Sequence, residues 1–262
     1  MDTIKIFDRK NTKIIAHRGG SLELENTIGA FISSANRSFF GIETDIYKTA
    51  DGRFIIYHDE TTARLCFKTV TPEEESFETL RGLEFRPYKG RISRQDIKMP
   101  SLEEYIDICK SYNKVCVLEI KHSLTEEDIK ELLNIVNGFE YLDNFIFISF
   151  YVENLIAIKE LCPTANVQFL IDATESTLDK KLSSVNFPPI LEEGDTGVIR
   201  LLKFLKNHHI DLDVWDQSVD QALIDTCHQM GIKVNVFTVN TPEDAQKFID
   251  MGADFITTDC LE

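Results

Sequence analysis

A histidine, an arginine and two glycines follow a short apolar run near the N-terminus. The stretch IIAHRGG leads from two isoleucines to His17 and Arg18, and then to Gly19 and Gly20. An imidazole exchanges a proton near neutral pH, a guanidinium binds anions, and glycine lets backbone approach a ligand closely. The stretch predicts an anion site with an acid–base group or, in the plainer interpretation, a strand that ends in a solvated turn.

Carboxylates stand at matching places in two further apolar runs, GIETDI and VCVLEIK. Glu43 and Asp45 share one face of the first run, because side chains alternate between the faces of a strand. Glu119 and Lys121 share one face of the second run. The opposite, apolar faces carry Ile42, Ile46, Leu118 and Ile120. If the apolar faces pack on helices, the ionisable side chains point into the mouth of a barrel, where barrel enzymes place catalysis.

Three carboxylates that converge in a confined mouth repel one another and cannot all stay ionised without a counter-charge. A divalent cation would supply that charge. Ligands that are all oxygen atoms favour a hard ion, so the sequence predicts one Mg²⁺ or Ca²⁺ held by Glu43, Asp45 and Glu119. The alternative is a set of salt bridges on the rim of a sheet.

A second histidine, His58, closes the run IIYHDE with Asp59 beside it. Together with His17 it gives two groups whose ordinary pKa lies near 6.5, which suits proton transfer near neutral pH. The alternative is a histidine at a turn. His122 directly follows Lys121 and is a candidate neighbour of the site. No role is assigned to His208, His209 and His228.

Short β-rich runs alternate with amphipathic stretches along the chain. The strands are expected at 13–17, 41–46, 53–58, 114–120, 145–150, 167–171, 211–215, 233–239 and 254–258. Helix starts are expected at Asn26, at Ser101 with Glu104 in capping-box spacing, at Thr125 and at Thr241. This alternation predicts an α/β fold, a (β/α)8 TIM barrel, with a doubly wound open sheet as the alternative.

Residues 60–100 break the alternation and carry both an acidic run and several basic residues. We interpret them as a small insertion after the second-strand region, over one end of the barrel. Residues 1–262 are then a single catalytic domain, a length that one barrel can fill.

The chain is acidic, with 28 Lys and Arg against 44 Asp and Glu and a net charge of −16. That charge argues against nucleic acid and anionic membrane as partners, because both bind basic surfaces. The sequence shows neither a membrane-spanning run nor a signal peptide, and its six cysteines are scattered without a CxxC pair. These features predict a cytoplasmic protein with reduced thiols and no stable membrane anchor, and they leave the oligomeric state open.

Taken in order, six segments resemble the signatures of the glycerophosphodiester phosphodiesterase family. They are AHRGGSLELENTIGAF, GIETDIYKTADGRFIIYHDETTAR, MPSLEEY, VLEIK, VFTVN and GADFITTD, and the resemblance as a whole runs from about residue 13 to 259. The resemblance implies a (β/α)8 barrel that hydrolyses small glycerophosphodiesters to glycerol 3-phosphate and an alcohol with a divalent cation. The alternatives are a lysophospholipase-D-like phosphodiesterase on the same barrel and a non-catalytic barrel that binds phosphate esters.

The resemblance also implies roles for individual residues. It makes His17 and His58 the acid–base pair. It makes Glu43, Asp45 and Glu119 the metal ligands, and Arg18 and Lys121 the phosphate-binding residues. Phe237 stands where the family commonly has tryptophan, so it keeps an apolar wall for the substrate but lacks the indole donor. The last signature departs from the usual Asp-x-Pro, with Cys260 and Leu261 after Asp259.

Overall fold

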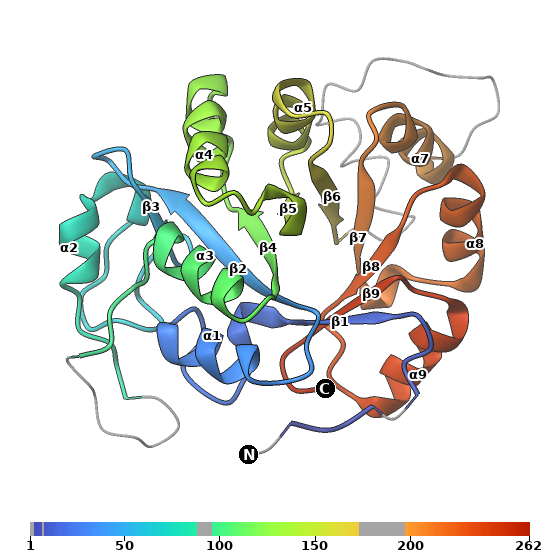
Figure 1. Ribbon diagram of the computed structural model, residues 1–262, viewed down its shortest axis with the longest axis horizontal. Coiled ribbons are helices and arrows are strands. Elements are labelled where there is room, and N and C mark those ends of the chain that lie inside the picture. The colour runs from blue at the N-terminus through green and yellow to red at the C-terminus, as the bar shows by residue number, and fades with distance from the viewer. Residues whose placement is uncertain (1–2, 7, 88–95, 173–196) are drawn as a thin grey trace.

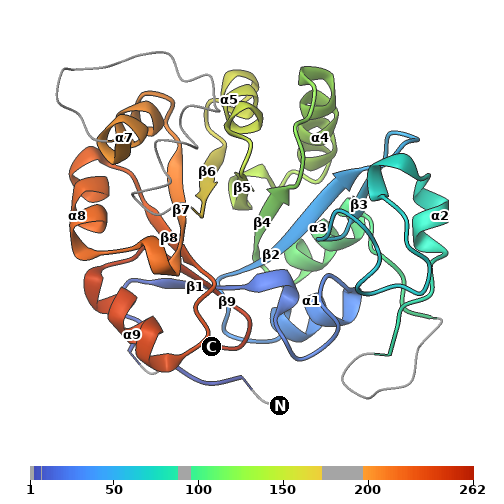
Figure 2. The same ribbon diagram turned by 180° about the vertical axis from the view of Figure 1, so that it is seen from behind.

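The structure is a computed structural model that describes residues 3–6, 8–87, 96–172 and 197–262. Eight parallel strands close into a barrel, because β1 pairs with both β2 and β9. Helices surround the strands (Figures 1 and 2), and Ile4 near the start of the chain bridges to Leu261 near its end. The closed ring confirms the predicted (β/α)8 barrel and excludes the open sheet.

The element bounds agree with the sequence pattern to within a few residues. The strands are β1 (Lys13–Ala16), β2 (Gly41–Lys48), β3 (Phe54–Ile56), β4 (Val115–Ile120), β5 (Phe145–Ser149), β6 (Asn166–Ile171), β7 (Asp211–Trp215), β8 (Val234–Phe237) and β9 (Phe255–Thr258). The helices are α1 (Ile28–Ala35), α2 (Phe77–Arg81), α3 (Leu102–Ser111), α4 (Glu126–Gly138), α5 (Val152–Leu161), α7 (Gly197–Asn207), α8 (Gln221–Met230) and α9 (Pro242–Met251). Short 3-10 turns are η1 (His17–Gly19), η2 (Pro72–Glu74), η3 (Leu142–Asn144) and η4 (Asp216–Ser218).

Each barrel strand has two differently packed faces. The outer face joins the helices in the main apolar core, which contains the predicted set Ile42, Ile46, Leu118 and Ile120. A smaller apolar cluster fills the barrel interior and contains Ile15, Val117, Ile146, Ile148, Leu170 and Phe255. The residues that alternate with the outer set therefore point inward, which brings the carboxylates of β2 and β4 into the barrel.

One expected strand is not part of the barrel. β3 pairs antiparallel with β2, with Ile56 opposite Ile46. The hairpin turns the chain back toward the barrel, and the amide of Tyr57 donates to the carbonyl of Asp45 at 3.1 Å. His58 therefore reaches the level of Asp45 from the returning arm of a hairpin. The sequence analysis placed His58 at the end of a strand without giving the direction of that strand, because a two-residue period does not reveal strand direction.

The helix caps agree with the sequence except at the first helix. Ser101 and Glu104 form the predicted capping box, and Thr125 and Thr241 cap α4 and α9. The cap of α1 is Thr27 and not Asn26. Asn26 has a φ of 55° and turns its amide inward, donating to Asp45 Oδ2 and accepting from Thr44 Oγ1 at 2.8 Å each. Because these buried hydrogen bonds already use the side chain of Asn26, the next residue, Thr27, caps the helix instead.

The segment between β3 and α3 forms a side lobe. It carries α2, which lies beyond β3 at the edge of the molecule (Figures 1 and 2). A separate apolar cluster holds it against the barrel, with Tyr47, Ile55, Phe77 and Leu80 among its members. Residues 88–95 of the predicted insertion lie outside the described residues. The domain boundaries stay a prediction.

Among the described residues, no helix combines the length and the apolar character needed to cross a bilayer.

Candidate active site

Three carboxylates meet inside the barrel mouth. Asp45 on β2 lies directly opposite Glu119 on β4, and Glu43 lies two residues before Asp45 on the same face. One oxygen from each can be chosen so that all three lie within 4.8 Å of one another. The side chains are buried, with exposed fractions of 2% for Glu43, none for Asp45 and 8% for Glu119.

The pKa values of these carboxyl groups are driven apart. Burial and the neighbouring charge of Asp45 raise the pKa of Glu43 well above its ordinary value. Burial raises the pKa of Glu119 to about 7, with Asp45 adding to the effect and Lys121 opposing it. The pKa of Asp45 is lowered despite burial, because Lys121, His58 and Arg18 stabilise its charge. Without a bound cation, the cluster therefore holds protons near neutral pH.

The donor set fits a divalent cation. Asp45 Oδ1 is buried and accepts no hydrogen bond among the described residues, although Lys121 Nζ lies 3.4 Å away. A buried carboxylate oxygen without a hydrogen bond is costly unless another charge meets it. Three carboxylates and no sulfur or imidazole ligand favour Mg²⁺ or Ca²⁺ over zinc.

Two cationic side chains border the cluster. Lys121 Nζ donates to Glu119 Oε1 at 2.7 Å. Arg18 Nη1 donates to Glu25 Oε1 at 3.0 Å, and its Nε lies 3.9 Å from Asp45 Oδ2. That Nε is buried and makes no hydrogen bond within the described part of the chain. Arg18 thus keeps one donor beside the carboxylate cluster from which an anionic oxygen could accept a hydrogen bond.

Each of the two predicted histidines is bound to an aspartate. His17 Nδ1 lies 2.7 Å from Asp259 Oδ1, and His58 Nδ1 lies 2.7 Å from Asp59 Oδ1. An ionised carboxylate only accepts hydrogen bonds, so Nδ1 carries the proton in both rings. The Nε2 atom of each neutral ring is then left to accept or return a proton.

A strained turn places Arg18 beside the carboxylates. Arg18 has a φ of 50°, which is unusual for a residue with a side chain. The backbone N–H of Arg18 donates to Glu43 Oε2 at 2.7 Å, and this hydrogen bond stabilises the strained conformation. Gly19 follows with a φ of 78°, and a Cβ there would lie 2.8 Å from the Ala30 Cβ. The two glycines that the sequence singled out thus let η1 pack directly on α1.

A pair of glycine substitutions separates packing from backbone strain. Gly19→Ala is expected to destabilise the fold by about 2–4 kcal/mol, because it adds a steric overlap to a disfavoured positive φ. Gly231 also has a positive φ, but a Cβ added there would meet no atom within 4 Å. We therefore expect Gly231→Ala to lower the free energy of unfolding by only about 1–2 kcal/mol. Urea unfolding of both variants measures the difference. Equal losses would show that the contact with α1 costs nothing.

The remaining predicted residues lie around the mouth. Phe237 ends β8, is partly buried and packs edge-on against Phe150 with ring centroids 6.3 Å apart. His122 stacks on Tyr47 at 5.5 Å, and its Nε2 lies 3.7 Å from Glu73 Oε1, so it faces the side lobe. His228 pairs with Asp254 outside the site.

Several residues of the site were not assigned by sequence reasoning. Asp259 and Asp59 bind the two histidines. Asn26 donates to Asp45, and Asn240 donates to Asp259. Glu25 and Arg64 form an ion pair next to these residues. Asp59 was noted only as a neighbour of His58. The spacing of single polar residues in loops carries no periodic signal, so the folded structure is needed to assign these pairs.

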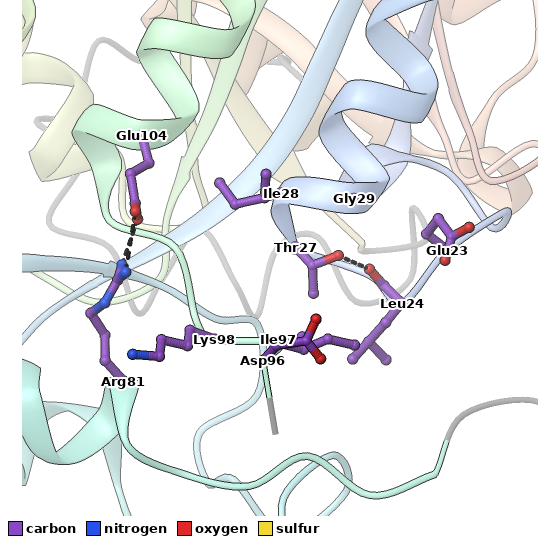
Figure 3. Close-up of a pocket in the computed structure, with 10 residues that line it drawn as sticks. All are labelled: Glu23, Leu24, Thr27, Ile28, Gly29, Arg81, Asp96, Ile97, Lys98 and Glu104. Atoms are coloured by element: carbon purple, nitrogen blue, oxygen red, sulfur yellow. Dashed lines mark hydrogen bonds and ion pairs between the residues drawn. The ribbon is translucent and has the colours of Figure 1, made fainter. Parts of the chain in front are cut away.

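A pocket of about 420 Å³ opens beside α1, α3 and the side lobe (Figure 3). Its walls include Glu23, Leu24 and Thr27 from the turn before α1, and the ion pair of Arg81 with Glu104. None of the predicted site residues lines it. The pocket is therefore separate from the carboxylate cluster.

Comparison with known proteins agrees with the fold and identifies a family. A model of the glycerophosphoryl diester phosphodiesterase family matches residues 17–262. A glycerophosphodiester phosphodiesterase of Caldanaerobacter subterraneus is 25% identical over 251 residues, which cover 95% of this chain and 94% of the relative. A solved glycerophosphodiester phosphodiesterase from Parabacteroides distasonis superposes with a TM-score of 0.72 at 23% identity, covering 95% and 93% of the two chains. An Oleispira antarctica phosphodiesterase, solved with the product sn-glycerol-3-phosphate, gives a TM-score of 0.76 at 22% identity, covering 94% and 92%.

Proposed function

The chain belongs to the glycerophosphoryl diester phosphodiesterase family, and from this premise we propose that it hydrolyses small glycerophosphodiesters to glycerol 3-phosphate and an alcohol. In this proposal His17 and His58 are the acid–base pair, and one divalent cation, Mg²⁺ or Ca²⁺, is held by Glu43, Asp45 and Glu119. The solved relative that holds sn-glycerol-3-phosphate supports this choice of product.

The charge balance of the mouth is the observation that carries the proposal. Three carboxylates face two cationic side chains, Arg18 and Lys121, which leaves one negative charge when all are ionised. A divalent cation turns this into one positive charge. A phosphodiester carries one negative charge, so the loaded site matches it, whereas the fully ionised site without a cation would repel it.

The protein residues then divide the work of hydrolysis. A bound divalent cation would polarise the phosphoryl group and offset its developing charge. Arg18 and Lys121 would bind non-bridging phosphate oxygens and fix the orientation of the diester. One imidazole would remove a proton from the nucleophile through its unprotonated Nε2. The other, which starts with a proton on Nε2 as well as on Nδ1, would give that proton to the departing alkoxide. Phe237 would provide an apolar wall for the substrate.

The identity of the nucleophile has two alternatives. It is either water or the hydroxyl group of the substrate's own glycerol, and the second route forms a cyclic phosphodiester before water opens it. Rapid quenching of a single turnover distinguishes them, because only the second route passes through a cyclic glycerophosphate. A trapped cyclic glycerophosphate would establish the second route, and its absence under single-turnover conditions would favour the first.

A turnover assay tests the proposed activity. Glycerophosphocholine and glycerophosphoethanolamine are expected to yield glycerol 3-phosphate in the presence of Mg²⁺ or Ca²⁺, with no turnover after chelation by EDTA. Lysophosphatidylcholine serves as the comparison. Faster cleavage of that lipid to lysophosphatidic acid would instead favour a lysophospholipase-D-like enzyme. Tight binding of the diesters without turnover would favour a non-catalytic barrel.

We also propose that residues 1–262 act as one catalytic domain in the cytoplasm. All six cysteines are free thiols and four of them are buried, which supports a reducing environment such as the cytoplasm. Fluorescence microscopy of the tagged chain in its own cell tests the location.

A further inference from the structure

Arg64 lies in the side lobe and connects two parts of the active site. Its Nη1 and Nη2 donate to Glu25 Oε2 and Oε1 at 2.8 and 2.6 Å. Its Nε and Nη2 donate to Asp59 Oδ2 and Oδ1 at 2.7 and 3.0 Å. The guanidinium therefore binds one carboxylate along each of two edges, an arrangement that only a planar fork of donors can make.

Both carboxylates that Arg64 holds touch a predicted site residue. Asp59 Oδ1 also accepts from His58 Nδ1, and Glu25 Oε1 also accepts from Arg18 Nη1. A continuous chain of charged hydrogen bonds thus runs from the phosphate-binding arginine to an acid–base histidine. The hydrogen bonds from Arg64 and His58 also keep the pKa of Asp59 below its ordinary value, although burial opposes this.

The other histidine shows why such an anchor matters. Asp259, which holds His17, is itself fixed by Asn240, whose Nδ2 donates to Asp259 Oδ2 at 2.7 Å. His58 and Asp59 are adjacent in sequence, and Asp59 has both oxygens bound by Arg64. Each histidine–aspartate pair therefore has a third residue that fixes the carboxylate plane, and with it the orientation of the ring.

Hydrogen bonds that do not involve Arg64 also hold the local fold of the side lobe. The Thr62 hydroxyl donates to the carbonyl of Lys68, and the amide of Val70 donates to that hydroxyl. The Cys66 amide donates to the Thr62 carbonyl, and Cys66 pairs with Phe85. The Arg64 side chain is 44% exposed and contributes little to the apolar core. Its four charged hydrogen bonds are thus directed at the site.

From this geometry we propose that Arg64 is a positioning residue for catalysis, acting through Asp59 on His58 and through Glu25 on Arg18. The inference rests on the proposed hydrolysis. It assigns Arg64 no contact with substrate. Its effect is to hold the His58 ring with Nδ1–H toward Asp59 and Nε2 toward the mouth.

Arg64→Met is the primary test, with Arg86→Met as the matched control from the same lobe. Arg86 donates to the Cys66 carbonyl and lies over Phe67, away from the site. We expect Arg64→Met to lower kcat for glycerophosphocholine by about 10–100-fold, the usual cost of losing a residue that orients a reacting group. Arg86→Met is expected to leave kcat unchanged. Arg64→Lys should recover little of the lost kcat, because one ammonium group cannot bind two carboxylates along two edges.

Nitrogen-15 NMR of the His58 ring gives a readout that a purely structural role would not move. In the wild type we expect Nδ1 to carry the proton at pH 8, and in Arg64→Met we expect a mixture of the two ring tautomers. Glu25→Gln, which loosens Arg64 without removing it, should give a smaller change in the same direction. An unchanged ring signal, or full recovery of kcat by lysine, would overturn the proposal. If the wild type hydrolyses no glycerophosphodiester, the proposed function fails, and the ring signal still tests Arg64.

Discussion

Glu119→Ala is expected to lower cation-dependent hydrolysis by at least about 10³-fold while the protein still folds. Several kcal/mol of transition-state stabilisation depend on a correctly held cation, and each 1.36 kcal/mol corresponds to a tenfold change in rate. Glu119 is the only one of the three carboxylates that β4 supplies. Its loss leaves two ligands on one strand, which cannot surround an ion from two sides.

The fold should tolerate this change for an electrostatic reason. Glu119 is buried near the like charges of Asp45 and Glu43, so its removal relieves repulsion in the cation-free protein. Lys121 keeps Asp45 Oδ1 as a partner at 3.4 Å. We therefore expect the melting temperature measured in EDTA to be no lower than that of the wild type. Glu131→Ala, which removes one of two partners of Lys48 on the surface, is the control for a lost carboxylate.

Proton release gives an independent measurement of the same site. The pKa of Glu119 is about 7 in the folded protein and ordinarily 4.5, so folding takes up a proton between these values. Its contribution to the stability of the cation-free protein thus falls as pH rises from 4.5 to 7. The rise in melting temperature caused by the cation should grow across the same range, and binding near pH 6.5 should release protons in calorimetry. Normal turnover of Glu119→Ala in EDTA would show that the metal-site assignment is wrong.

The barrel and the carboxylate cluster were predictable because both follow from short periods in the sequence. Alternation in β2 and β4 places Glu43, Asp45 and Glu119 on the face opposite the apolar residues, and the helices that cover the apolar face make it the inner one. Caps such as Ser101 with Glu104 are also local, and the structure confirms them. The helices and strands therefore appeared near their predicted positions.

The residues that support the site were not predictable in this way. Asp259 meets His17 only because β9 closes the ring beside β1. Arg64 meets Glu25 across 39 positions through a lobe without a regular period. The reversal at β3 was missed for the same reason, since strand direction depends on pairing partners and not on the pattern within one strand. Asn26 shows how a buried polar contact can override a cap preference that is worth about 1 kcal/mol.

His17→Ala is expected to lower kcat by about 10²–10⁴-fold with little change in cation affinity. The range is the usual contribution of one positioned acid–base group. His17 does not belong to the group of side chains that could hold the ion, and its Nδ1 is bound to Asp259. Its loss therefore removes a proton carrier and no metal ligand. Steady-state kinetics give kcat, and calorimetry with Mg²⁺ or Ca²⁺ gives the affinity.

A third histidine–aspartate pair supplies the matched control for His17→Ala. His228 Nε2 lies 2.9 Å from Asp254 Oδ2, near the C-terminal end of α8 and away from the carboxylate cluster. His228→Ala therefore removes an equivalent ion pair and should leave kcat unchanged. Added imidazole should restore part of the activity of His17→Ala, because a diffusible base can replace a missing proton carrier but not a lost structural contact. A kcat within about threefold of the wild type would remove His17 from the acid–base pair, since that is far below the contribution of a positioned acid or base. A large fall in cation affinity would instead place His17 among the ligands.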